Sequence, residues 1–217
     1  MFQKMWSWTL LTITLASVAH GDFIANHFMD QILNEMRVQV TNGGLDPLRA
    51  NPFNVFVRKN GAFNHDCTGQ FLQGSGYGLS NIVRLGDCTY GPYGNGMKLG
   101  CNVALSSFKF MMNADIKGDT FSDKTHSVST SSQVHPRSYA VIEVQGTRGF
   151  AARLDKITVP SITLTTNVIQ GKIDLNSARF TDFVKQVNGN LATQLAMTLT
   201  NAYSHLFANV VTQHAMP

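Results

Sequence analysis

The sequence predicts an α+β protein in which a curled antiparallel β-sheet wraps around a long C-terminal α-helix, with an amphipathic helix at the N-terminus. Apolar residues recur at steps of three and four through Asn176–Val211, which is the spacing of one helix face. From residue 54 to about residue 174 they alternate instead, between short glycine-rich turns, as in antiparallel strands. A helix cannot bury an apolar stripe alone, so we expect the sheet to cover it.

Residues 1–21 have the pattern of a secretory signal peptide. Lys4 supplies a basic start, Met5–Leu15 is a short apolar stretch, and small residues follow. Cleavage after Ala19 or Gly21 fits this pattern; Gly21 is favoured and leaves one domain, 22–217, exported from the cell. The apolar stretch is too short to span a bilayer, and no later run reaches about 18 apolar residues, so we expect no transmembrane segment.

The first helix of the mature chain is expected over Asp22–Val40, with Asn42-Gly43-Gly44 as its stop. Its apolar stripe is Ile24, Phe28, Ile32, Met36 and Val40.

Strands are expected between this helix and the last one, and Gly118–Arg137 is expected to be a mobile polar excursion. The clearest alternation is Asn102–Ala114, where Phe108, Phe110 and Met112 share a face. The predicted strands are Asn54–Lys59, Asp66–Gln73, Leu79–Arg84, Met97–Lys117, Ser138–Val144, Phe150–Leu154 and Ile162–Asp174.

The C-terminal helix is expected to bend or break at Gly189, because glycine costs about 1 kcal/mol relative to alanine within a helix. Its opposite face is polar and nearly uncharged, which leaves open a homo-oligomer formed through that face. The apolar stripe comprises Phe180, Phe183, Val184, Val187, Leu191, Leu195, Leu199, Ala202, Tyr203, Leu206, Phe207 and Val210.

Three cysteines in an exported chain predict one disulfide and one free thiol. Cys88 and Cys101 bracket a loop whose midpoint lies between Gly94 and Asn95, so a hairpin centred there would place them opposite each other. A tight Asn95-Gly96 turn would shift that register. Cys88–Cys101 is the favoured bond, and Cys67–Cys88 is the alternative.

The composition excludes some classes of function. The formal charge is +4, but no segment concentrates lysine and arginine, so we expect no nucleic-acid partner. Charged residues make up only 14% of the chain, while 14 Phe and 9 Met supply more apolar side chain than a plain core of this size requires.

The chain resembles the arthropod secreted proteins related to group 7 mite allergens. The resemblance rests on Gly78–Asp87 (GLSNIVRLGD), on the alternating strand Met97–Met112, and on Ile173-Asp174-Leu175 followed by the amphipathic run to Val211. These proteins share a fold with the juvenile-hormone-binding and takeout-like proteins and with bactericidal/permeability-increasing protein, the TULIP-type lipid-binding superfamily. The resemblance implies an elongated apolar cavity between sheet and helix. Cys88 and Cys101 depart from the pattern.

Catalytic and metal-binding patterns are weak in this sequence. No Gly-x-Ser-x-Gly elbow occurs, and the acidic residues are scattered singly. His65-Asp66-Cys67 suggests a Cys/His pair, but neighbours in a strand point to opposite faces, which leaves only His65 and Cys67 side by side. Asp123, His126 and His135 are irregularly spaced, so we expect no metal site. We therefore expect no enzyme and no cofactor beyond a bound lipid or carotenoid.

The leading hypothesis is a secreted carrier that holds a hydrophobic ligand in an apolar tunnel between sheet and long helix. The same apolar residues could simply fill a core. Tyr139, Arg153 and Lys109 are candidate polar contacts near a tunnel mouth. The alternative hypothesis is an extracellular recognition protein that binds microbial lipid or a protein partner through an apolar tip bearing Tyr90 and Tyr93. The expected lining residues are Phe108, Phe110, Met112, Phe180, Phe183, Val187, Leu191 and Leu195.

Overall fold

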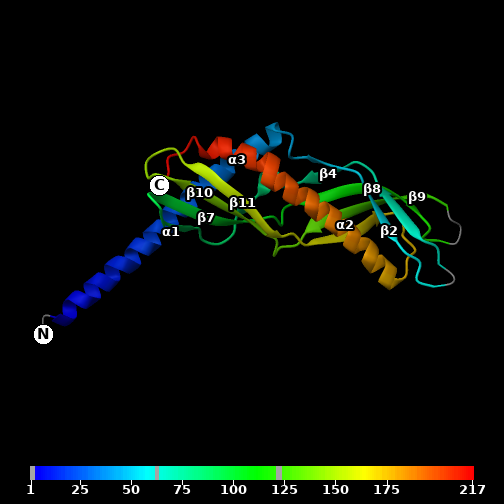
Figure 1. Ribbon diagram of the computed structural model, residues 1–217, viewed down its shortest axis with the longest axis horizontal. Coiled ribbons are helices and arrows are strands. Elements are labelled where there is room, and N and C mark those ends of the chain that lie inside the picture. The colour runs from blue at the N-terminus through cyan, green and yellow to red at the C-terminus, as the bar shows by residue number, and fades with distance from the viewer. Residues whose placement is uncertain (1–2, 62–63, 121–123) are drawn as a thin grey trace.

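The computed structural model describes residues 3–61, 64–120 and 124–217, with side-chain surroundings from Phe23 onward. Over these residues the chain forms two antiparallel sheets that lie end to end, with the C-terminal helix running along both (Figure 1). Helix α1 (Gln3–Asn42) lies against the end of the molecule that holds the C-terminus. The predicted α+β class, with a curled sheet and a long closing helix, is confirmed.

Sheet A has a central strand, β8, that pairs on one side with β4 and then β3, and on the other side with β9. The edges of the sheet are therefore β1 and β2 on one side and β12 on the other. Its described strands are β1 (Leu48–Ala50), β2 (Phe53–Val57), β3 (Cys67–Phe71), β4 (Gly74–Tyr77), β8 (Lys109–Lys117), β9 (His126–Val134) and β12 (Leu164–Gln170).

Sheet B has the order β11-β10-β7-β5, and β6 also pairs with β7. Its described strands are β5 (Val83–Arg84), β6 (Thr89–Tyr93), β7 (Gly96–Ala104), β10 (Tyr139–Gly146) and β11 (Arg153–Ser161).

The β6–β7 hairpin turns at Gly94-Asn95, because Tyr93 pairs with Gly96. This register places Cys88 opposite Cys101, and the two form a disulfide. The structure therefore has the favoured pairing and leaves Cys67 as a buried free thiol.

The two sheets join at a waist formed by the chain segments 105–108, 135–138 and 162–163. Backbone hydrogen bonds link these segments, including one of 2.8 Å from the His135 N–H to the Thr163 carbonyl. The predicted strand Met97–Lys117 is divided here, because the chain turns between β7 and β8. The turn also changes the alternation, so that Val103 in β7 and Phe110 in β8 both face the core.

Strand β9 lies inside the segment that was expected to be a mobile excursion, and that expectation is wrong for the described residues. The sequence of β9 does not alternate between apolar and polar residues, because two of its core-facing side chains, Thr130 and Ser132, are polar. The Ser132 hydroxyl lies 2.6 Å from that of Thr166, so burial does not leave it unpaired. Residues 121–123 lie outside the described part of the chain.

Two other predicted strands differ from the structure. Leu79–Arg84 is a short 3₁₀ turn, η1 (Leu79–Asn81), followed by β5. The Asp46 carboxylate accepts the N–H groups of Gly78 and Ser80, at 3.1 and 2.9 Å, and this favours the turn. Strand β11 begins and ends later than the predicted Phe150–Leu154.

The C-terminal helix is continuous over Ser177–Val211. It consists of α2 (Ser177–Thr198), a π-helical turn η2 (Leu199–Tyr203) and α3 (Ser204–Val211). The Asn176 side chain caps its start by accepting the Arg179 N–H at 3.1 Å. Gly189 does not interrupt the helix, because packing of the apolar face outweighs the cost of about 1 kcal/mol for one glycine; the irregularity lies at η2 instead.

Helix α2 closes sheet A by bonding to both of its edges. The Gln186 amide bonds to the Phe56 N–H and carbonyl, at 3.0 and 2.8 Å, and Gln194 does the same to Asn51, at 2.8 and 3.1 Å. On its other flank, the Asn188 side chain donates to the Leu164 carbonyl of β12 at 2.9 Å. These three amides take the place of neighbouring strands, so the sheet and helix form a closed roll.

The segment Gly78–Asp87 fastens α1 to sheet B. Arg84 forms a bidentate pair with Asp30, with both N–O distances at 3.0 Å. This hydrogen bonding raises the pKa of Arg84. The Asn26 side chain donates to Asp87 and accepts the Cys88 N–H, both at 2.8 Å. The motif that carries the sequence resemblance thus has a structural role here.

Replacing Gln186 and Gln194 together by Ala removes four hydrogen bonds, two to Phe56 of β2 and two to Asn51 just before β2. Because this edge is exposed and water can replace the amides, we expect the free energy of unfolding to fall by about 1–3 kcal/mol. Urea denaturation measures the loss. Lys185→Ala, at an exposed neighbour, is the control and should change stability little. A double variant as stable as the wild type would contradict the proposed closure.

Candidate ligand-binding site

The structure brings the predicted lining residues into one hydrophobic core. Phe180 is partly buried at the start of α2, and Met112 also borders a surface cleft of about 290 Å³ beside Gly74 and Ile169. The fully buried members are Phe108, which directly precedes β8, Phe110 of β8, and Phe183, Val187, Leu191 and Leu195 of α2, with Met112 at 2% exposure.

Packing within sheet A is tight around these residues. Phe108 and Phe110 meet edge to face with ring centroids 4.8 Å apart. Phe108 lies against Gly76, where a Cβ would come within 2.4 Å of its ring. Phe183 packs 5.9 Å from Phe71 and against Gly69 in the same way. In this half of the molecule the side chains fill the space between sheet and helix.

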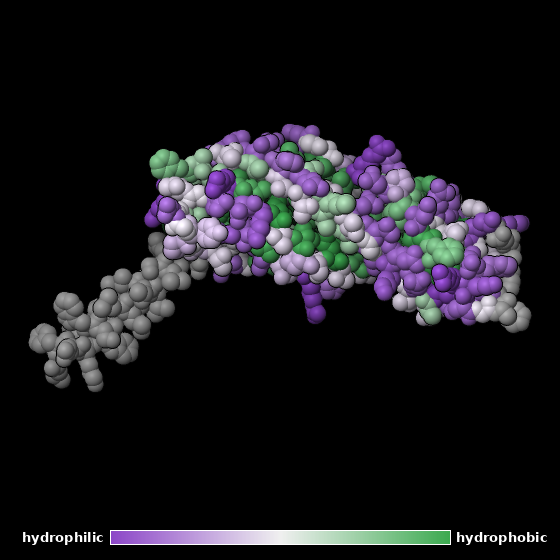
Figure 2. Space-filling model, viewed as in Figure 1, coloured by the Kyte–Doolittle hydropathy of each residue, from purple (hydrophilic) through white to green (hydrophobic). Residues whose placement is uncertain are grey.

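Beside sheet B the apolar seam between the helix and β11 is partly open to solvent. Leu154, Val159 and Ile162 pack against the core but are only partly buried. Met197, near the end of α2, is 60% exposed. Figure 2 shows hydrophobic residues gathered over the middle of the molecule, along β11 and beside the C-terminal helix. Here η2 and α3 pack on β11. Among the described residues, no side chain of η2 or α3 forms a hydrogen bond to the backbone of β11. In contrast, side-chain amides of α2 form hydrogen bonds to the backbones of β2 and β12.

The π-helical turn η2 carries the largest fully buried side chain of this seam, Tyr203. The core-facing residues from Phe183 to Phe207 are spaced strictly by four. Four residues turn an α-helix by about 400°, so this stripe advances about 40° around the helix at each step. The wider π-turn reduces that advance and keeps Tyr203 and Phe207 directed to the core, with ring centroids 6.4 Å apart.

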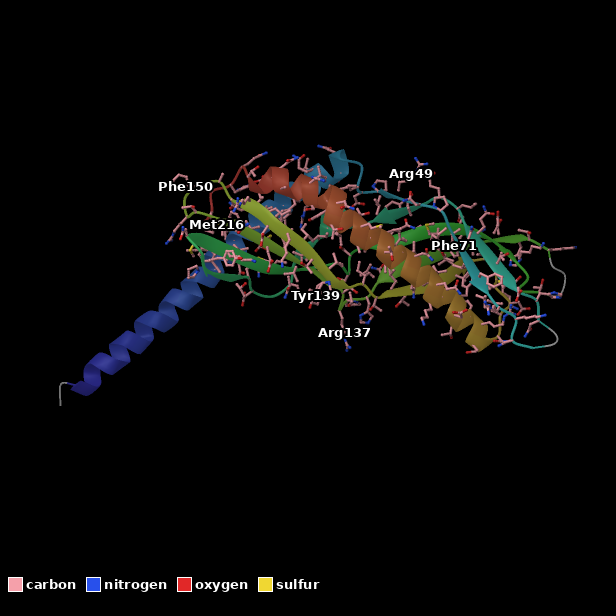
Figure 3. The ribbon with its side chains drawn as sticks, viewed as in Figure 1. Arg49, Phe71, Arg137, Tyr139, Phe150 and Met216 are labelled. Atoms are coloured by element: carbon pink, nitrogen blue, oxygen red, sulfur yellow. A yellow bond between two sulfur atoms is a disulfide. The ribbon has the colours of Figure 1, made fainter. Side chains whose placement is uncertain are left out.

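A second candidate site is a cleft of about 600 Å³ at the outer end of sheet B, between the β6–β7 hairpin and the β10–β11 loop. Tyr93 and Phe150 flank it and are 57% and 69% exposed. Met97 and Arg153 also line it. Figure 3 shows Phe150 and Met216 at this end of the molecule, opposite the end that holds Phe71. We call this region the tip cleft.

Near the tip cleft the lysines form ion pairs, whereas two arginines have no acidic partner among the described residues. Lys98 bridges Glu143 and Asp155 at 3.2 and 3.1 Å, and Lys156 lies 3.1 Å from Glu143. These hydrogen bonds raise the pKa of Lys98, so it stays charged at neutral pH. Arg148 and Arg153 are exposed and have no carboxylate partner in the described part of the chain.

The candidate polar residues do not form one site. Arg153 lines the tip cleft, whereas Tyr139 and Lys109 begin strands next to the waist. Figure 3 places Tyr139 beside Arg137 there, away from Phe150. Tyr90, expected to be exposed with Tyr93, is half-buried; its hydroxyl donates to the Pro217 carbonyl. Burial raises the pKa of Tyr90.

The groups considered for catalysis or metal binding are not arranged for either in the described residues. Burial, together with the nearby Asp119 carboxylate, raises the pKa of the Cys67 thiol to about 11, whereas a nucleophilic cysteine needs a lowered one. His126 and His135 lie at opposite ends of β9, and Asp123 lies outside the described residues. Within those residues no three His, Cys, Asp or Glu side chains group to hold a metal, and no helix is long and apolar enough to cross a membrane.

The comparisons with known proteins give structural likenesses only. No family model and no curated protein matches the sequence. The fold is similar to the crystal structure of lipopolysaccharide binding protein, with a TM-score of 0.49 and 10% identity over 87% of this chain; the match spans 40% of that protein. It is also similar to takeout 1 of Epiphyas postvittana, with a TM-score of 0.36, 10% identity and 87% coverage of both chains. Takeout-like proteins are among those that the sequence resemblance names.

Several residues that organise the site escaped the sequence reasoning. Gln186 and Gln194 are eight residues apart, a little over two helical turns, and this spacing on a flank of the stripe was a usable signal. Tyr203 was placed on the apolar stripe, but nothing local indicated a π-turn. Phe150 was assigned to a strand, and its exposure depends on the loop that the tertiary fold creates.

Proposed function

We propose that this protein is a secreted, non-enzymatic carrier of a hydrophobic ligand such as a lipid, terpenoid or carotenoid. The ligand lies along the seam between β11 and the C-terminal helix. The observation that carries the proposal is the contrast between the two halves of the helix. Amide side chains bond α2 to both edges of sheet A. Among the described residues, only apolar contacts hold η2 and α3 on β11.

The chemistry of the seam suits an apolar ligand with few polar groups. Leu154, Val159 and Ile162 offer aliphatic surface, and Met197 offers a flexible side chain that adapts to different shapes. The Cys88–Cys101 disulfide fits an oxidising, extracellular setting.

The free energies of burial and association indicate how such a ligand would be held. Burial contributes about 0.8 kcal/mol per CH₂ group, or roughly 13 kcal/mol for a chain of about 16 carbons. Association itself costs about 4–15 kcal/mol. Chain length therefore sets whether binding occurs at all, and a single hydrogen bond of about 1 kcal/mol adjusts the affinity by several-fold.

Native mass spectrometry followed by organic extraction tests the carrier proposal on protein purified from its own source. We expect a stoichiometric extra mass that extracts into organic solvent. A ligand-free mass, together with no uptake of long-chain lipids or carotenoids on incubation, would contradict the proposal.

A pair of neighbouring substitutions on β11 locates the ligand. Val159→Lys places a charge on the apolar side of the strand and should weaken uptake of an apolar probe at least tenfold. Thr158→Lys is the matched control, because Thr158 is exposed and adjacent residues point to opposite faces of a strand. Titration with the probe measures both variants, and urea denaturation checks that both fold. Equal uptake by the two variants would place the ligand elsewhere.

A second candidate function, recognition of a lipid surface or protein partner, is favoured by the tip cleft. Exposed Tyr93 and Phe150 combine apolar surface with the positive charge of Arg148 and Arg153, a composition suited to an anionic, partly apolar partner.

Tyr93→Ala separates the two functions. Under the recognition hypothesis it abolishes binding to vesicles that contain anionic phospholipid, as measured by co-sedimentation. Under the carrier hypothesis it leaves ligand uptake unchanged. Tyr77→Ala, which removes an exposed tyrosine from sheet A, is the control and should change neither property. If Tyr93→Ala loses ligand uptake while Tyr77→Ala keeps it, the result would contradict a ligand site at β11.

A further inference from the structure

A cleft of about 290 Å³ lies on the outer face of sheet A, and we call it the outer cleft. It extends across β4, β8, β9 and β12. Met111 and Asn113 face outward here, because they alternate along β8 with core-facing residues such as Phe110. The volume is near the lower limit of small-molecule sites, which is about 300 Å³. The outer cleft is therefore separate from the seam beside β11 and has the size for one ring-shaped group.

Two irregularities of sheet A meet at the outer cleft. Strand β8 changes its partner here from β3 to β4, and Met112 and Asn113 lie between the two partners. In β12 the register shifts between Val168 and Gln170, which makes Ile169 a bulge residue. Bulges redirect side chains and are frequent next to active sites. As a result, the consecutive residues Ile169 and Gln170 are both exposed at the cleft.

Apolar side chains lie on both sides of the outer cleft. Tyr77 of β4 is 41% exposed, and Ile169 of β12 is 53% exposed. Met111 is half-buried on β8, a strand that lies between theirs. An exposed aromatic ring provides a flat surface that can stack on another ring and a hydroxyl that can form a hydrogen bond.

The side-chain amides of Gln73, Asn113 and Gln170 supply free hydrogen-bonding groups at the cleft. The Asn113 oxygen accepts the Ser129 hydroxyl at 2.8 Å. The Gln73 oxygen accepts an N–H of Arg49 at 2.5 Å. These bonds orient both side chains and leave their NH₂ groups without a partner among the described residues. The Gln170 amide forms no side-chain hydrogen bond in that part of the chain, so it can both donate and accept.

The composition of the lining selects one class of ligand. Its described residues include no Lys, Arg, His, Asp or Glu, so a phosphate, sulfate or carboxylate group would find no opposite charge. A hydrocarbon would leave the amides unpaired, which costs free energy. A neutral pyranose sugar matches both parts of the cleft, because its hydroxyls surround a ring whose C–H face is apolar.

We propose that the outer cleft binds one neutral hexopyranose ring, as a free sugar or as the terminal residue of a glycan. Tyr77 and Ile169 contact the C–H face of the ring, and the amides of Gln73, Asn113 and Gln170 bond to its hydroxyls. This inference goes beyond the proposed carrier function and does not depend on it, because no residue of the β11 seam takes part.

Immobilised oligosaccharides with terminal glucose, galactose, mannose or N-acetylglucosamine are the probes that test the proposal. We expect the wild type to bind at least one of them, and to bind its sulfated counterpart no more tightly. No binding to any of the neutral sugars, or binding to the sulfated forms alone, would overturn the proposal. The free methyl glycoside of the bound sugar should compete, because the cleft holds one ring. Competition by the longer glycan alone would overturn a one-ring site.

Two substitutions locate the sugar, and calorimetric titration measures their effects. Tyr77→Ala removes the stacking ring and should weaken binding about tenfold. Phe56→Ala removes an exposed ring from β2 of the same sheet and is its control. Gln170→Ala should weaken binding about three- to tenfold, because it removes one or two hydrogen bonds. Asn167→Ala, at an exposed amide of the same strand outside the cleft lining, is the matched control and should bind normally.

The outcomes separate this site from the carrier function. Urea denaturation checks that the variants fold, and Gln170→Ala keeps the test valid if Tyr77→Ala does not fold. Sugar binding that is unchanged in the folded cleft variants would place the sugar elsewhere and overturn the proposal. Uptake of an apolar ligand should be the same in these variants as in the wild type, so either proposal can fail while the other stands.

Discussion

The closing of a curled sheet by one helix is the constraint on which the rest of this structure depends. A curled sheet has two edges whose backbone groups need partners, and α2 supplies them with the side-chain amides of Gln186, Gln194 and Asn188. The C-terminal helix, of which α2 is the first part and α3 the last, buries an apolar stripe from Phe183 to Phe207. The helix therefore pairs the sheet edges and covers the core at the same time. If it moved away from the edges, it would also expose the core.

This constraint divides the molecule into a fixed half and a looser half. In sheet A, aromatic rings pack against glycines such as Gly69 and Gly76, and little space remains. Beside sheet B, the C-terminal helix keeps its apolar contacts with β11 while bonds to the strand backbone are lacking in the described residues. Apolar contacts are not directional, so a hydrocarbon ligand can replace some of them at small cost. On the proposed carrier function, the ligand therefore lies in this seam.

Much of the fold could be predicted from the sequence, because burial imposes periodic patterns on helices and strands. The C-terminal helix and the first helix follow from such patterns, and the Cys88–Cys101 hairpin follows from the symmetric position of the cysteines about their loop. Strand β9 was missed because Thr130 and Ser132 face the core, and their acceptors become visible only in three dimensions. The candidate lining residues lie in the core or against it, and their contact with a ligand stays a prediction. The partly open seam at β11 depends on how distant segments pack, which no local pattern contains.

Hydrogen exchange with and without methyl oleate tests the central claim most directly. The claim predicts that ligand increases amide protection in β11 and η2 and leaves the β2–α2 contact unchanged. Increased protection confined to the β6–β7 hairpin, or equal protection along the whole helix, would contradict a ligand held in the seam between β11 and the C-terminal helix.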